Sequence, residues 1–167
     1  KNGKVLREWK GSSNDMRGVA FTPDGEYILT ASFHADYSAD RGGMRLWGME
    51  TGLEVRKFKE SYTSLNMLTF IDNERACSAH HRGVIVWDVR SGNSLAHFPQ
   101  SSSVSCVHTN LSTSRMAVGG PSSNLRILDL NDGKEIRKLE IPDDPKASAD
   151  VYSLALSPDG QRVAAGV

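Results

Sequence analysis

Short apolar stretches separated by polar turns run along the whole chain, and the same order of stretches returns about every 40 residues. Each stretch is about 5–7 residues long, which is the length of a typical strand, and no window has a sustained helical period. The first stretch of each unit holds apolar residues at matching places: Met16, Val19, Phe21; Leu65, Leu68, Phe70; Val104, Val107, Thr109; Val151, Leu154, Leu156. The pattern therefore predicts repeated β-sheets.

Three further stretches complete each unit. The second stretches span 27–32, 75–80, 115–120 and 162–167, and the third carry Trp47, Trp87 or Leu128. The fourth, at 53–58, 94–98 and 134–139, follow Thr-Gly, Ser-Gly and Asp-Gly turns. Turns rich in Pro, Asp and Gly favour hairpins, so each unit is predicted to be a four-stranded antiparallel meander.

The repeated motifs resemble the WD-repeat family of β-propellers. They are FTPDG at 21–25, MRLW at 44–47, VIVWD at 84–88 and LSPDG at 156–160. The resemblance covers essentially the whole chain and implies an all-β fold: a segment of a β-propeller built from about three and a half to four four-stranded blades.

The phase of the repeats predicts the division of the chain. Residues 1–12 match the outer, fourth strand of a preceding blade; 13–60, 61–100 and 101–146 are blades; and 147–167 hold the first two strands of a further blade. An open arc would leave unpaired sheet edges. We therefore expect either further blades of the same chain or a second copy, in a homo-dimer, to complete a ring.

The charge of the chain limits the kinds of partner that it can be expected to bind, and its cysteines indicate the redox environment. The chain has 20 basic and 20 acidic side chains, which gives no electrostatic footprint for nucleic acid or an anionic membrane. Cys77 and Cys106 fall in strands and are predicted to be buried thiols rather than a disulfide. A reducing, cytoplasmic location is the corresponding expectation.

The resemblance also implies a hydrogen-bonded set in each blade, and most of it is missing here. In this family a His precedes the first strand, a Ser or Thr lies on the second strand, and an Asp precedes the third-strand Trp. Serines take the His places at 12 and 61, while His81 and Ser122 stand in the Asp places. Ser32 and Trp47 are the expected remnant in the first blade, so packing between blades is predicted to be mainly apolar.

Catalytic chemistry is not indicated. His80 and His81 are expected in a solvated turn, and His34, Asp36 and Asp40 in a polar loop rather than a metal site. There is no Gly-x-Ser-x-Gly nucleophile motif and no phosphate-binding glycine loop before a helix. We therefore predict no catalytic, cofactor or metal site, and no enzyme activity in this segment.

Two longer connections suggest a binding face. The loop at 33–41, with Phe33 and Tyr37, and the connection at 141–150 exceed their counterparts, and both connection types emerge at the same end of a blade. Tolerated surface variation explains them equally well. Family resemblance places partner contacts at the starts of the first strands, so the predicted contact residues are Asp15, Arg17, Tyr37, Ser64, Asn66, Ser103, Ser105, Asp150 and Tyr152.

The function expected from these features is a non-catalytic scaffold that binds a protein or peptide. The alternative is a targeting or regulatory module of a larger enzyme, such as a kinase, with its chemistry in another domain. A catalytic propeller that uses its central channel is a third interpretation, but the inner strands offer no converging His, Asp and Glu set.

Overall fold

The computed structural model describes residues 3–5, 8, 16–32, 43–58, 65–122, 124–141 and 150–167. Those residues form fourteen strands and one 3₁₀ helix. The strands are β1 (Met16–Phe21), β2 (Tyr27–Ser32), β3 (Gly43–Gly48), β4 (Glu54–Lys57), β5 (Leu65–Phe70), β6 (Arg75–His80), β7 (Gly83–Asp88), β8 (Ser94–Pro99), β9 (Cys106–Asn110), β10 (Arg115–Gly120), β11 (Asn124–Asp129), β12 (Glu135–Leu139), β13 (Ser153–Leu156) and β14 (Val163–Gly166). The helix η1 (Leu111–Thr113) lies between β9 and β10.

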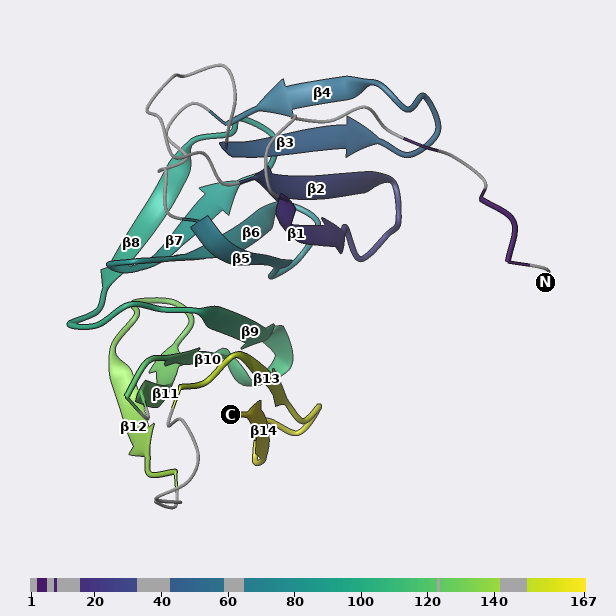
Figure 1. Cartoon of the computed structure of the whole chain (residues 1–167). Coiled ribbons are helices and arrows are strands. Elements are labelled where there is room, and N and C mark those ends of the chain that lie inside the picture. Colours follow the sequence, from purple (N-terminus) through teal and green to yellow (C-terminus); the bar gives the residue numbers. More distant parts are fainter. Residues whose placement is uncertain are drawn as a thin grey trace.

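The strands form four antiparallel sheets in chain order. β1–β4, β5–β8 and β9–β12 make three four-stranded meanders, and β13–β14 make a two-stranded hairpin. We call these the first to fourth blades. Their first strands β1, β5, β9 and β13 contact one another in sequence, while β4, β8 and β12 lie on the outside of the arc (Figure 1). The predicted all-β, propeller-like fold is confirmed.

Apolar clusters fill each space between neighbouring blades, because period-two alternation gives every strand one face toward each neighbour. Between the first two blades, Phe58 and Trp87 meet edge to face, with ring centroids 5.8 Å apart. Met116, Val118 and Leu128 pack against the second blade in the next cluster. Both cysteines are free and buried, as predicted, and burial raises the pKa of the Cys77 thiol to about 12.

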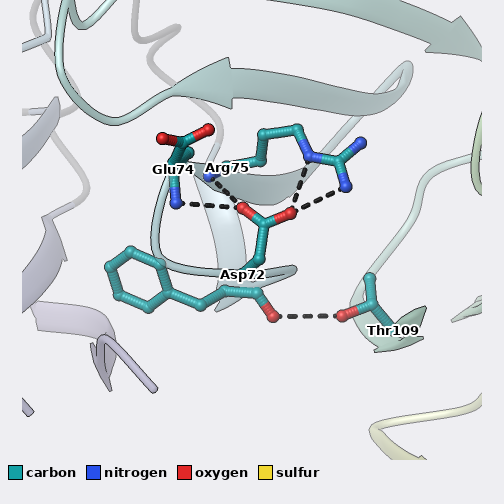
Figure 2. Close-up of polar contacts among 5 residues, drawn as sticks. Asp72, Glu74, Arg75 and Thr109 are labelled. Atoms are coloured by element: carbon teal, nitrogen blue, oxygen red, sulfur yellow. Dashed lines mark hydrogen bonds and ion pairs between the residues drawn. The ribbon is translucent and has the colours of Figure 1, made fainter. Parts of the chain in front are cut away.

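Polar contacts fix the β5–β6 turn of the second blade and tie this blade to the third. The Asp72 carboxylate accepts hydrogen bonds from the backbone N–H groups of Glu74 and Arg75 and from the Arg75 guanidinium (Figure 2). Burial raises the pKa of Asp72, but these hydrogen bonds outweigh burial and hold it below its usual value. Beside this turn, the Thr109 hydroxyl of β9 donates to the Phe70 carbonyl of β5 over 3.1 Å, which ties the third blade to the second.

The predicted Ser32–Trp47 remnant is wrong. Trp47 donates its indole N–H to Thr30 over 2.9 Å, while the Ser32 hydroxyl donates to the Gly43 carbonyl. The register explains the difference: Trp47 lies opposite Ile28, which places Thr30, two residues further along β2, diagonally beside the indole. The insertion predicted at 33–41 hides this register in the sequence.

The expectation of a solvated turn for His80 is also wrong. His80 is the last residue of β6 and is buried, and the turn begins only at His81, which is exposed. Period two places His80 on the same face as Ser78, and its Nε2 lies 2.6 Å from the Ser78 hydroxyl. Trp87 donates to that hydroxyl over 2.7 Å, so the second blade contains a buried Trp–Ser–His chain.

The first strand of the first blade is an exception to the burial pattern. Leu65, Val104 and Val151 are fully buried at their equivalent positions. The repeat pattern predicts that Met16 points inward like these residues, but Met16 is 50% exposed, so that prediction is wrong. Val19 and Phe21 are likewise 65% and 59% exposed. In each later blade, these positions pack on the blade before it.

The predicted blade boundaries stay predictions. The positions at which one blade would pass into the next, around 13, 60 and 146, lie outside the described residues. Of the outer strand predicted at 1–12, only residues 3–5 and 8 are described, and none of these four is in a strand.

Candidate partner-binding face

Each sheet has two ends, and one of them gathers the connections singled out by the sequence. An antiparallel meander places its second-to-third-strand turn and the connection into the next blade at the same end. Backbone hydrogen bonds join these two connection types directly: Val104 N–H donates to the His80 carbonyl over 3.1 Å, and Gln100 N–H to the Arg82 carbonyl over 3.0 Å. We call this end the loop face, and the end holding the other turns the hairpin face.

A hydrogen bond between the same two connection types also links the third blade to the fourth. Ser122 N–H, in the β10–β11 turn, donates to the Asp150 carboxylate over 3.0 Å. Asp150 precedes β13, so its side chain helps to fix the start of the fourth blade against the third. The loop face is thus held together by backbone groups and short side chains, not only by the sheets beneath it.

The predicted contact residues within the described chain lie at the loop-face ends of the first strands. Tyr152 is 65% exposed and Arg17 is also exposed. Ser103 and Ser105 are half-buried in the connection before β9. These positions come from different blades, and the structure places them along one rim.

Asn66 has a second role that the sequence did not indicate. Its side-chain amide donates to the Val104 carbonyl over 2.8 Å, which joins β5 to the start of the next blade. Three predicted contacts, Asp15, Tyr37 and Ser64, lie outside the described residues, as do Phe33 and most of the two long connections.

The loop face also contains a pocket that sequence reasoning missed. It has a volume of about 520 Å³ and lies between the β6–β7 turn, the end of β8 and the β8–β9 connection. Its lining residues are His81, Arg82, His97, Pro99, Gln100, Ser101, Ser102 and Ser103. The available signals in the sequence are the serine run at 101–103 and the basic turn at Arg82, which are separated by 18 residues along the chain.

The described residues include no group of three or more His, Cys, Asp and Glu side chains that could hold a metal ion. Two histidines with lowered pKa values, His80 and His108, lie in packed parts of the blades. Burial lowers the pKa of His80, with His97 adding to the effect, and burial alone lowers that of His108, whose Nδ1 accepts the Leu156 N–H.

No helix in the part of the chain that the structure describes is both long and apolar enough to span a membrane.

Comparison with known proteins agrees with this architecture. The family model described as "WD domain, G-beta repeat" matches residues 3–47, a span that ends at Trp47 in β3. Residues 3–47 are therefore similar to a WD repeat. The repeats at 65–99 and 106–139 have the same four-strand order and register, which extends the architecture beyond the matched part.

A curated relative is similar to part of this chain. The Denticleless protein homolog of Danio rerio is 28% identical over 111 residues, which is 65% of this chain and 16% of that protein. The aligned part is therefore a small fraction of the relative's length.

Proposed function

We propose that this WD-repeat segment is a non-catalytic scaffold that binds a protein or peptide partner on its loop face. The observation that carries the proposal is the fixed alignment of first-strand starts from successive blades along one rim, cross-linked by the hydrogen bonds at His80, Arg82 and Asp150. A preformed surface loses little conformational freedom on binding, which favours affinity.

The exposed side chains of this rim suit a protein interface. Tyr152 presents an aromatic ring and Arg17 a guanidinium, and both residue types are enriched at interface hot spots. WD repeats generally mediate protein interactions, and the match of residues 3–47 to a WD repeat supports the same kind of role here.

The proposal is tested by quantitative binding to a partner identified by cross-linking and mass spectrometry. Tyr152→Ala and Arg17→Ala should each weaken binding by about tenfold, the effect of losing a hot-spot side chain. Leu53→Ala and Arg90→Ala on the hairpin face are the matched controls, since both side chains are exposed there. Equal affinity of all four variants would refute the assignment of the loop face.

A further inference from the structure

The pocket on the loop face is unusual for its charge. Among the described residues, its lining contains Arg82, two imidazoles and a run of hydroxyls, and no carboxylate. This local excess of positively charged groups and hydrogen-bond donors contrasts with the chain as a whole, which has equal numbers of basic and acidic side chains, 20 of each. Within the described part of the chain, Arg82 makes no ion pair, whereas Arg45, Arg75 and Arg126 each pair with an Asp or Glu.

The polar groups of the wall present donors to the pocket. Arg126 of β11 donates to Gln100 Oε1 over 3.5 Å and to the Ser101 hydroxyl oxygen over 3.4 Å. These contacts use acceptor atoms, which leaves the Gln100 amide NH₂ and the Ser101 O–H able to donate hydrogen bonds to a ligand. Because Arg126 also pairs with Glu135, at 3.2 Å, its own charge is balanced outside the pocket.

Backbone hydrogen bonds hold the pocket in shape. The bonds from Gln100 to Arg82 and from Val104 to His80 bracket the Ser101–Ser103 segment on both sides. Beneath the turn, His80 is anchored to Ser78 and through it to Trp87. The Arg82 turn and the serine segment are therefore fixed relative to each other before any ligand arrives, which lowers the ordering cost of binding.

We propose that this pocket binds an acidic segment of a protein partner, with a carboxylate seated against Arg82 and the hydroxyls of the serine segment. A guanidinium and a carboxylate form strong, directional hydrogen bonds, and a volume of about 520 Å³ accommodates one or two side chains of an extended peptide. This inference rests on the proposed function, which it refines by assigning the chemistry of the partner.

The test measures binding of the 167-residue chain to short fluorescent peptides by anisotropy. A glutamate-rich peptide should bind, and the same peptide with Gln in place of each Glu should bind at least about tenfold more weakly, because the amide carries no charge. Raising the salt concentration should weaken the first interaction, since the site is partly exposed to solvent.

Variants locate the site. Arg82→Glu and Arg82→Gln should each weaken binding of the glutamate-rich peptide by about tenfold or more. Arg90→Glu makes the same charge change on the hairpin face, where Arg90 is exposed and pairs with Glu74, and it should leave affinity within about twofold. Melting curves that match the unaltered chain confirm that the Arg82 variants are folded.

Three results would overturn the inference. They are equal affinity for the Glu and Gln peptides, equal effects of Arg82→Glu and Arg90→Glu, and tighter binding of a single-stranded RNA of similar charge that also depends on Arg82. If Arg82→Glu has no effect but Tyr152→Ala still abolishes capture of the protein partner, the acidic-ligand proposal fails while the scaffold function stands.

Discussion

At the scale of single residues, the buried polar chain of Trp87, Ser78 and His80 is the main specific feature of the second blade. All three side chains are buried, so the Trp87 indole N–H and the Ser78 hydroxyl need hydrogen-bond partners inside the protein. The Ser78 hydroxyl serves both neighbours: it receives the indole N–H of Trp87 and exchanges a hydrogen bond with His80.

Removal of that hydroxyl should destabilise the protein. Ser78→Ala leaves the Trp87 N–H buried without its acceptor, which costs about 1–3 kcal/mol of unfolding free energy. Ser102→Ala, in the loop-face connection, is the control and should change stability by less than about 0.5 kcal/mol. Urea denaturation followed by tryptophan fluorescence measures both, and equal stabilities would show that the hydroxyl contributes nothing.

The buried His80 at the end of this hydrogen-bonded series predicts that the free energy of unfolding depends on pH. Burial, with the adjacent His97, lowers the pKa of His80 from 6.5 to about 4, so the unfolded chain binds the proton more readily than the folded one. The stabilisation is therefore complete above pH 6.5 and is lost as the pH falls toward 4, with a slope of at most about 1.4 kcal/mol per pH unit from this group.

The variant His80→Gln isolates that contribution. It removes the titrating group while it keeps a polar side chain, so the unfolding free energy should fall less steeply between pH 6.5 and 5 than in the unaltered chain. His108, whose pKa is also lowered by burial, contributes to the pH dependence of the unfolding free energy in both proteins. Superimposable pH profiles would contradict the buried position of His80.

At the scale of elements, turns and strands reproduce one plan in each blade. The Gly of the third-to-fourth-strand turn has a positive φ, at +71° in Gly133, and in that turn it lies directly against the Phe98 ring of the preceding blade. Gly25, in the first-to-second-strand turn, has a similar φ of +74° but nothing within contact distance of a Cβ. Substituting these two glycines therefore distinguishes the cost of backbone strain from the cost of steric crowding.

Alanine at each glycine measures the two costs. Gly25→Ala should cost about 1–2 kcal/mol because a side chain disfavours the left-handed region. Gly133→Ala should cost that amount and a further 1–3 kcal/mol, since its Cβ would displace Phe98 from between the second and third blades. Equal destabilisation in thermal or urea unfolding would show that the blades do not pack closely at this turn.

Most of the element plan could be predicted from the sequence, because alternation and turn residues are local signals. The strands at 27–32, 75–80 and 115–120 were predicted with the bounds that the structure has. The hydrogen-bond partner of Trp47, the burial of His80 and the exposure of Met16 could not be predicted, since they depend on strand register and on which blade lies alongside. The Arg82 pocket was missed because it joins a turn and a connection that are separated by the whole of β7 and β8.

At the scale of the whole molecule, each blade is stabilised by its neighbours. The three apolar clusters each combine residues of two successive blades, as expected for a repeat architecture. The first blade still presents Met16, Val19 and Phe21 at positions that are buried in the later blades. We expect this apolar strip to pack against another blade, supplied either by the same chain or by a second copy.

The isolated 167-residue chain should therefore self-associate. Light scattering coupled to size exclusion should give a mass above the 18.3 kDa of one chain, and Val19→Asp should shift the distribution toward the monomer, because a charge in an apolar interface is costly. Val55→Asp, at another exposed valine in β4, is the control. A mass of 18.3 kDa at all concentrations would contradict this expectation.

Nuclear magnetic resonance can locate partner binding on the loop face. Chemical shifts of the 167-residue chain are compared with and without the identified partner. We expect changes concentrated at Arg82, Ser101–Ser103 and Tyr152, with the hairpin-face turns around Asp24 and Asp88 unchanged. Changes concentrated at those hairpin-face turns, with Arg82 and Tyr152 unaffected, would contradict binding on the loop face.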